Sequence, residues 1–200
     1  MVARILKEKH IKSETVVDVG CGGGALWPYI ADRFNQYIGV DIEQYPGFPE
    51  TGQFVPCNLE TYQIPLPSAS TDVVVAVETI EHLENPRAFF RELKRLLKPG
   101  GWLLVTTPNQ LSFLSKLTLC LKNQFNAFQD ASYPAHITAL LEIDLCRIAM
   151  EVGLLDIFVR YSACGRIPGG SLHWPVFLPR ALPRCFSDNI CLLARQSHGS

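Results

Sequence analysis

Residues 16–27, VVDVGCGGGALW, constrain the fold of this chain more than any other stretch. An apolar, β-branched run carries Asp18, and four of the five residues from 20 to 24 are glycine. This pattern predicts a buried strand, a sharp turn with little side-chain bulk, and then the opening of a helix. Because a ligand can touch the backbone of such a turn, the stretch predicts a nucleotide-type cofactor loop, with a ligand-free glycine turn as the alternative.

Gly20, Gly22 and Ala25 also satisfy the G-x-G-x-x-[G/A] spacing of dinucleotide-binding loops, a spacing that is weak evidence by itself. The stretch IGVDIE strengthens the prediction of a cofactor loop. Asp41 follows Gly22 by 19 residues, near the position where an acidic side chain hydrogen-bonds ribose hydroxyls. Glu43 could take this role instead, and a solvated loop carboxylate is the other reading of Asp41.

Further β-branched runs are separated by segments able to form helices or crossovers, which predicts a parallel α/β sheet buried on both faces. The runs are QYIGVD (36–41), QFVPCNL (53–59), TDVVVAVE (71–78) and GWLLVTTP (101–108). Residues 87–101, RAFFRELKRLLKPGG, have apolar residues at helical spacing and predict a helix that stops at Pro-Gly-Gly.

The pattern changes after residue 109. The amphipathic segment 110–128 stands where simple alternation needs only a loop, so it predicts a helical insertion near 110–135. Residues 136–155 predict a helix, and residues 155–163 and 187–196 predict a closing pair of strands, one of them antiparallel. The prolines between those strands predict an irregular loop near 164–186. A chain of 200 residues fits a single domain.

Composition excludes some classes of function. The 18 basic and 19 acidic residues leave no global field to attract nucleic acid, so no nucleic-acid partner is predicted. Seven scattered cysteines without a C-x-x-C pair argue against a disulfide framework and fit a reduced, cytoplasmic location. No apolar run approaches the roughly 18 residues that span a bilayer.

Taken together, these motifs resemble class I S-adenosylmethionine-dependent methyltransferases from about residue 14 onward. DVGCGGG resembles the family's D-x-G-x-G-x-G loop, VDIE the acidic end of its second strand, and CNLE the segment that frames adenine. DVVVAVETIEHLENP and LLKPGGWLLVTTPN resemble its fourth and fifth strands with their flanking turns. The resemblance implies a Rossmann-like three-layer α/β sandwich whose seven-stranded, mostly parallel sheet has a reversed last strand.

The resemblance also implies roles by position for S-adenosylmethionine. The residues expected at the cofactor are Asp18, Gly20, Cys21 and Gly22 at the methionine portion, Asp41 and Ile42 at the ribose, Asn58 and Leu59 at the adenine, and Val77 near the methyl group. The family often has Asp where this chain has Asn58, but an amide oxygen still accepts a hydrogen bond from the adenine amine.

Residues 78–86, ETIEHLENP, raise the question of a metal. Glu78, Glu81 and His82 stand at i, i+3 and i+4, so a helical turn would place them on one face. Ubiquinone-biosynthesis O-methyltransferases and plant small-RNA 2′-O-methyltransferases resemble this run and use a later histidine, here His136. That resemblance implies a divalent cation such as Mg²⁺ held by Glu78, Glu81, His82 and His136. The alternatives are a metal-free catalytic role for Glu78, Glu81 and His82, or the acidic entrance of an ordinary helix.

We therefore expect methyl transfer from S-adenosylmethionine to an oxygen of a small or lipid-like acceptor. A non-catalytic cofactor-binding module and an NAD(P)-dependent oxidoreductase are the rival interpretations. The segment 110–128 resembles the position where relatives carry a lid. Its apolar face would cover a lipid-like acceptor, contact a membrane surface peripherally, or pack on the core.

Overall fold

A computed structural model of the chain describes residues 1–61, 63–170 and 172–198. One seven-stranded sheet runs through it in the order β3-β2-β1-β4-β5-β7-β6. The strands are β1 Ser13–Val19, β2 Phe34–Asp41, β3 Gln53–Pro56, β4 Thr71–Val77, β5 Leu97–Pro108, β6 Leu154–Tyr161 and β7 Asn189–Gln196. Strands β1 to β5 pair in parallel, and β7 lies antiparallel to both β5 and β6. The predicted Rossmann-like α/β sheet with a reversed last strand is confirmed.

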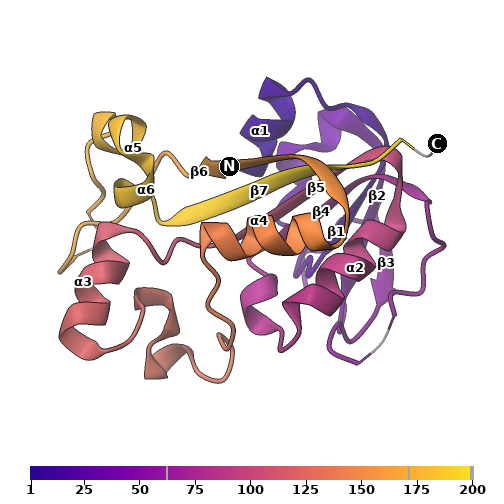
Figure 1. Ribbon diagram of the computed structural model, residues 1–200. Helices are drawn as coiled ribbons and strands as arrows, with labels where there is room; N and C mark the ends of the chain where they lie inside the picture. The colour runs from indigo at the N-terminus through magenta and orange to yellow at the C-terminus, as the bar shows by residue number, and fades with distance from the viewer. Residues whose placement is uncertain (62, 171, 199–200) are drawn as a thin grey trace.

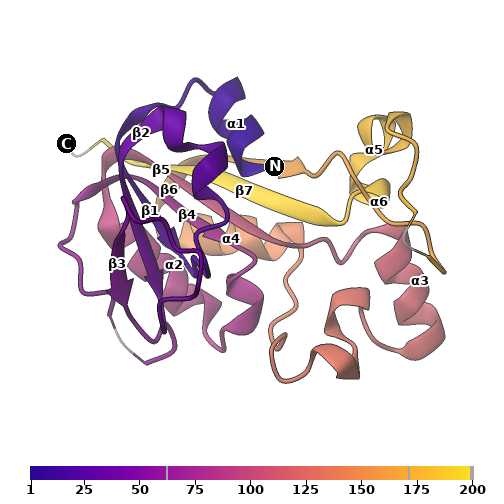
Figure 2. The same ribbon diagram turned by 180° about the vertical axis from the view of Figure 1, so that it is seen from behind.

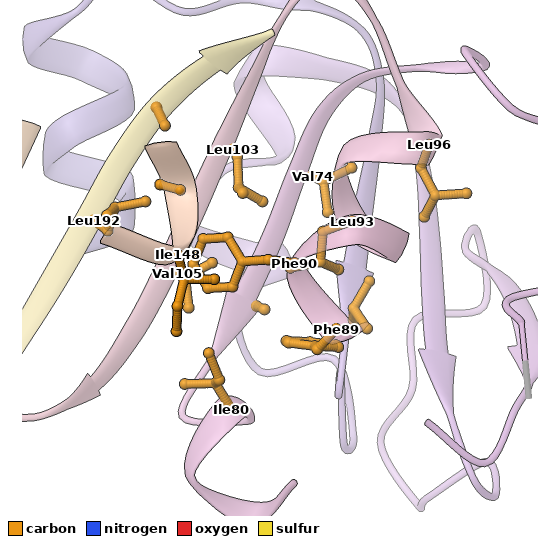
Figure 3. Close-up of a cluster of buried hydrophobic side chains, with 14 of the residues drawn as sticks. Val74, Ile80, Phe89, Phe90, Leu93, Leu96, Leu103, Val105, Ile148 and Leu192 are labelled. Carbon is orange, nitrogen blue, oxygen red and sulfur yellow. The ribbon is translucent and has the colours of Figure 1, made fainter. Parts of the chain in front are cut away.

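Helices α2 (Pro86–Leu96) and α4 (Glu142–Glu151) cover one face of the sheet (Figure 1). The Asn85 side chain caps α2 by accepting a hydrogen bond from the Ala88 backbone N–H at 2.9 Å. Apolar residues recur on α2 every three or four positions, and Figure 3 shows Phe90 and Leu93 turned toward the strands beside Ile148 of α4. Burial of this stripe holds the helix on the sheet.

The opposite face has a thinner cover. It consists of helix α1 (Val2–Glu8) and two 3₁₀ turns, Trp27–Tyr29 and Ala31–Arg33. The predicted helix after the glycine loop was wrong: between Gly24 and the start of β2 at Phe34, the chain forms only turns and these two 3₁₀ helices. Aromatic packing fills the space instead, with the rings of Trp27 and Tyr37 4.9 Å apart.

The insertion and the proline-rich loop lie together beyond one end of the sheet (Figures 1 and 2). Helix α3 (Phe113–Lys122) is followed by two 3₁₀ turns, Asn126–Phe128 and Asp130–Ser132. The loop predicted as irregular contains two short helices, α5 (Phe177–Ala181) and α6 (Pro183–Phe186). Among the described residues, no helix has both the length and the apolar character needed to cross a bilayer.

The helix predicted for residues 136–155 is shorter than expected, because α4 starts only at Glu142. Residues just before α4 form hydrogen bonds outside the helix. The backbone N–H groups of Ile137 and Thr138 both donate to the Glu81 carbonyl at 3.0 Å. These bonds fasten the end of the insertion to the 3₁₀ turn Ile80–His82, which follows β4.

Candidate functional site

The glycine loop follows β1, and three of its glycines have backbone conformations that residues other than glycine rarely adopt. Gly20, Gly22 and Gly24 have φ angles of +75°, +51° and +73°. A Cβ atom on Gly20 would lie 2.3 Å from the Thr79 hydroxyl oxygen, so close packing excludes a side chain there. A Cβ on Gly22 would meet nothing within 4 Å. The loop therefore exposes its backbone to open space at Gly22.

That space is a hollow of about 470 Å³ at the carboxyl ends of strands β1 to β4, which we call the cofactor hollow. Parallel α/β sheets bind their ligands at this edge. Its lining residues are Gly20, Gly22, Asp41, Ile42, Tyr45, Cys57, Asn58, Leu59, Glu60, Glu78, Thr79, His82 and Leu83. Six of the predicted cofactor residues are among them, whereas Asp18, Cys21 and Val77 are not.

Asp41 organises the loop as well as lining the hollow. Its carboxylate accepts hydrogen bonds from the Gly22 N–H at 2.8 Å and from the Ile42 N–H at 2.7 Å. A carboxylate has about four acceptor positions, so these bonds leave capacity for ligand hydroxyls. The reading of Asp41 as a merely solvated loop carboxylate does not fit these contacts.

Asp18 lies beneath the loop and is buried. The Tyr37 hydroxyl donates to its Oδ2 at 2.8 Å, while Oδ1 has no partner among the described residues. Burial raises the pKa of this carboxyl to about 7, against the opposing effect of the Tyr37 hydrogen bond. Burial also raises the pKa of the neighbouring Cys21 thiol to about 12, which does not suit it to act as a nucleophile.

Asn58 and Leu59 follow β3 and line the far side of the cofactor hollow. The Asn58 side-chain oxygen accepts a hydrogen bond from the Glu60 N–H at 3.0 Å, which closes a turn two residues on. This bond holds the Asn58 amide at the wall of the hollow and still leaves its oxygen a second lone pair.

Glu78 leaves β4 in a left-handed conformation, with φ at +51°. Thr106 of β5 holds it there: the Glu78 N–H donates to the Thr106 hydroxyl at 3.0 Å, and that hydroxyl donates to Glu78 Oε1 at 2.7 Å. Because of this kink, Glu78 stands outside the turn that carries Glu81 and His82. The predicted common helical face for the three residues was wrong. Strained backbone of this kind is concentrated at functional sites.

Glu81, His82 and His136 do converge. Each offers one ligand atom, and these atoms lie within 4.8 Å of one another. Nδ1 of His82 lies 2.7 Å from the Ala135 carbonyl oxygen, and Nδ1 of His136 lies 2.6 Å from that of Ala127. A carbonyl can only accept, so both neutral rings carry their proton on Nδ1 and present a lone pair on Nε2.

Glu81 is fully buried beside the two histidines. The Thr107 hydroxyl donates to its Oε2 at 3.2 Å, and Oε1 has no partner among the described residues. Burial, aided by the Glu78 charge, raises the pKa of Glu81 to about 8. An unpaired buried carboxylate oxygen is costly unless a proton or a cation satisfies it.

The cluster thus differs from the predicted set of four. One carboxylate and two imidazoles converge, and Glu78 is not part of the group. Two nitrogen donors suit zinc, manganese or cobalt better than Mg²⁺, which prefers oxygen ligands. The donor chemistry fits a divalent transition metal.

Sequence reasoning missed Thr106 and Thr107, which hold the two glutamates from neighbouring positions of β5. A signal was present, because two hydroxyl residues end an otherwise apolar strand at the ligand-binding edge of the sheet. Tyr37, which bonds Asp18, gave no comparable signal, since an aromatic residue in a strand is ordinary.

The reversed strand beside a mostly parallel sheet, together with a glycine-loop hollow at its carboxyl edge, defines the class I S-adenosylmethionine-dependent methyltransferase fold. Residues 1–156 match the family described as a methyltransferase domain, and the chain belongs to that family.

Curated relatives agree with this assignment. A protein of Mycobacterium tuberculosis named "probable S-adenosylmethionine-dependent methyltransferase" is 30% identical over 164 residues, which cover 79% of this chain and 53% of the relative. The ubiquinone biosynthesis O-methyltransferase of Leptothrix cholodnii is 33% identical over 107 residues, covering 48% of this chain and 44% of that protein. The chain thus spans about half the length of these relatives or less.

Solved structures support the fold alone, because their sequence identity to the chain is low. A SAM-dependent methyltransferase from Archaeoglobus fulgidus superposes with a TM-score of 0.69 at 19% identity, covering 98% of this chain and 93% of that one. An S-adenosylmethionine-dependent methyltransferase from Mesorhizobium loti gives a TM-score of 0.66 at 14% identity and covers 96% of both chains.

Proposed function

We propose that the protein transfers the methyl group of S-adenosylmethionine to an oxygen of a small or lipid-like acceptor. The observation that carries this proposal is the Gly22 backbone, which is open to a hollow of about 470 Å³ in a chain of the methyltransferase-domain family. The name of the ubiquinone biosynthesis O-methyltransferases supports oxygen as the acceptor atom.

Different residues of the chain bind different parts of S-adenosylmethionine. Gly20, Gly22 and Asp41 bind the methionine and ribose portions, and Asn58 and Leu59 bind the adenine. When bound, S-adenosylmethionine supplies an activated methyl group for in-line displacement, so the protein must chiefly position the acceptor and remove a hydroxyl proton. Glu78 is the candidate for that task, since it lines the cofactor hollow and Thr106 fixes its carboxylate.

We also propose that Glu81, His82 and His136 hold a divalent cation. Glu81 Oε1, which has no hydrogen-bond partner within the described ranges, and the two Nε2 lone pairs support this proposal. A cation there would lower the pKa of an acceptor hydroxyl and so ease its deprotonation. The alternative, in which Glu81 and His82 act without metal, predicts the same residues to be essential but activity independent of added ions.

Titration calorimetry with S-adenosylhomocysteine and with NAD tests the cofactor. We expect binding of S-adenosylhomocysteine alone, and binding of NAD alone would replace the proposal with an oxidoreductase. A screen of hydroxylated acceptors with methyl-labelled S-adenosylmethionine then tests turnover. Cofactor binding without transfer to any acceptor would favour a non-catalytic module.

Metal dependence has its own test. Treatment with EDTA should abolish transfer, and adding back Zn²⁺, Mn²⁺ or Mg²⁺ one at a time should identify the ion. Glu81→Gln and His136→Ala should lose bound metal by elemental analysis while keeping S-adenosylhomocysteine affinity within a few-fold. Full wild-type activity in EDTA would exclude the cation.

We propose in addition that the protein contacts anionic membrane surfaces through the helical insertion and the proline-rich loop. Residues 109–129 and 164–187 contain five Lys or Arg residues and no Asp or Glu. Arg166 and Arg184 form ion pairs with Asp188 and Glu142, so the positive charge that remains for lipid is that of Lys116, Lys122 and Arg180. Exposed apolar side chains share these segments: Phe113, Leu119, Leu121, Leu172, Val176, Phe177 and Leu182. Apolar residues beside cations are typical of surfaces that bind lipid headgroups.

Sedimentation with phosphatidylcholine vesicles, with or without phosphatidylglycerol, tests this contact. We expect binding to the anionic vesicles that weakens as salt is raised. Leu121→Ser, at a side chain 75% exposed on α3, should reduce it several-fold. The matched change Leu155→Ser, at a residue 55% exposed on β6, should leave it unchanged. Equal sedimentation of all variants with both vesicles would contradict the proposal.

A further inference from the structure

A hollow of about 300 Å³, which we call the distal hollow, lies at the amino ends of strands β1 and β4. The cofactor hollow lies at the carboxyl ends of the same strands, so the two hollows are at opposite edges of the sheet. They share no lining residue. The distal hollow is lined by Lys9, His10, Ile11, Lys12, Ser13, Asp72, Val73, Lys98, Pro99, Gly100, Gly101 and Trp102.

Positive charge is concentrated in this lining. Lys9, Lys12 and Lys98 face a single carboxylate, that of Asp72, whereas the whole chain has nearly equal numbers of basic and acidic residues. The lining therefore carries two positive charges in excess. A hollow lined mainly by one sign of charge raises the local concentration of ions of the opposite sign.

The excess charge is not neutralised inside the protein. The Asp72 carboxylate accepts hydrogen bonds from Lys98 Nζ at 2.9 Å and from the Thr15 N–H at 3.0 Å. Within the described ranges, Lys9 and Lys12 form no ion pair. Lys9 Nζ lies over the ring of Phe158, 4.5 Å from its centroid, a contact that leaves the ammonium charge in place.

Strand β7 adds a further cation beside the distal hollow. The Arg195 guanidinium lies over the Trp102 ring, 5.2 Å from its centroid, and Arg195 Nε donates to the Gly100 carbonyl at 3.0 Å. These two contacts fix the guanidinium next to two lining residues. The site thus combines several cations with an apolar wall formed by Pro99 and Trp102.

The distal hollow lies away from the helical insertion. The His198 ring packs against Gly100, where an added Cβ would lie 2.4 Å from a ring carbon. In Figures 1 and 2 the end of β7 lies on the opposite side of the molecule from α3. A flat membrane bound through the insertion and the proline-rich loop would therefore not cover the distal hollow.

We propose that the distal hollow binds a phosphate monoester that carries a small apolar or aromatic group. A phosphate monoester has a charge of about −1.5 to −2 at pH 7, which matches the excess charge of the lining. The volume of about 300 Å³ is roughly ten times the share of one water molecule in the liquid. It leaves room for an organic group against Pro99 and Trp102. The site is separate from the proposed methyl transfer.

Ser13 provides a second observation in favour of a ligand. It lines the distal hollow, and its hydroxyl oxygen is buried with no hydrogen-bond partner among the described residues. A buried hydroxyl without a partner costs free energy. A change of the Ser13 rotamer would let this hydroxyl donate to a phosphate oxygen, and hydrogen bonds to charged acceptors are the stronger kind.

NMR titration with phenyl phosphate tests the proposal. We expect amide shifts in residues 9–13 and 98–102, with an affinity that falls as salt is raised. Phenyl methyl phosphate, a diester with a single charge, should bind several-fold more weakly. Saturating S-adenosylhomocysteine should leave the phenyl phosphate affinity unchanged. Shifts confined to the cofactor hollow, or equal affinities for the two esters, would overturn the assignment.

Three variants separate the site from general surface charge. Lys12→Gln should weaken phenyl phosphate binding about two- to five-fold, the range for one exposed ion pair. Asp72→Asn removes the competing carboxylate and should strengthen binding by a similar factor. Lys7→Gln, an exposed position on α1 outside the distal hollow, is the control and should change nothing. Thermal unfolding checks that each variant folds. Equal effects of Lys12→Gln and Lys7→Gln would contradict the proposal.

The phosphate monoester could be a soluble compound or the headgroup of phosphatidate. Sedimentation with phosphatidate vesicles distinguishes these sources. We expect Lys12→Gln to weaken phenyl phosphate binding and to leave vesicle binding unchanged, which assigns the site to a soluble compound. Loss of vesicle binding in Lys12→Gln would assign it to the lipid headgroup.

Discussion

The backbone N–H of Gly22 donates a hydrogen bond to the Asp41 carboxylate across 2.8 Å, and this bond joins the loop after β1 to the end of β2. The same carboxylate accepts from the Ile42 N–H at 2.7 Å. Asp41 thereby determines the shape of the glycine loop in addition to lining the hollow beside it. Loss of this carboxylate should disturb the loop even before any ligand arrives.

Replacing Asp41 by Asn should weaken S-adenosylhomocysteine binding about 10- to 100-fold. The amide has one oxygen where the carboxylate has two, and hydrogen bonds to a charged acceptor contribute about 1.5–3 kcal/mol. Titration calorimetry measures the change. Glu43→Gln is the control, because Glu43 was the other candidate for the ribose; a larger loss from that variant would transfer the role to Glu43.

Gly22→Ala should chiefly reduce ligand affinity, whereas Gly20→Ala should chiefly reduce the stability of the fold. The Gly22 variant adds a methyl group to the cofactor hollow at a φ of +51°, so we expect a loss of ligand affinity with about 1 kcal/mol of destabilisation. The Gly20 variant places its methyl group against Thr79 and should destabilise the whole fold more strongly. Urea unfolding and calorimetry on both proteins separate the effects. Equal stability losses would contradict this distinction.

Asp18→Asn should change how stability depends on pH. Folding raises the pKa of Asp18 from 3.8 to about 7, so the native state keeps a proton that the unfolded chain releases. Its contribution to the free energy of unfolding is therefore fully present below about pH 4 and declines as pH rises to about 7, by at most about 1.4 kcal/mol per pH unit. Urea unfolding from pH 4 to pH 8 should show this decline relative to the variant. Parallel curves would mean that Asp18 ionises normally.

Asn109→Ala should loosen the proline-rich loop. The buried Asn109 side chain donates to the carbonyls of Arg184 and Ser187 at 2.9 and 2.8 Å. Unpairing them should cost about 1–3 kcal/mol and speed amide exchange in residues 164–187. Asn35→Ala removes an exposed bond of similar length to Glu14 and should cost less than about 0.5 kcal/mol. Similar losses in both variants would rule out this role for Asn109.

The sheet could be predicted because each strand is indicated by a residue pattern within its own short segment of the sequence. Buried strands such as β1 and β4 are β-branched runs of strand length. The glycine loop was identified for the same reason. The helix before β5 was predicted to stop at Pro-Gly-Gly, whereas α2 ends at Leu96 and those three residues lie in β5. The helix after the glycine loop was mispredicted: residues 25–33 form only turns and 3₁₀ helices before Phe34, and the glycine motif does not distinguish these from an α-helix.

The candidate site was only partly predictable, because its geometry depends on pairs distant in sequence. Glu78 departs from the helical spacing through its bonds with Thr106, 28 residues away. His136 reaches His82 only because backbone bonds to the Glu81 carbonyl fasten the end of the insertion there. The spacing of apolar and polar residues around Glu78 or around His136 does not predict contacts between residues so far apart in sequence.

The position of β7 between β5 and β6 also has a consequence for the order in which the protein can assemble on the ribosome. Strand β6 is synthesised first but, in the described part of the chain, it pairs only with β7, which begins 28 residues after β6 ends. Until then the apolar edge of β5 stays open, and open edges recruit other chains. A chain cut short at residue 188, before β7, should therefore aggregate or bind chaperones more than the full chain.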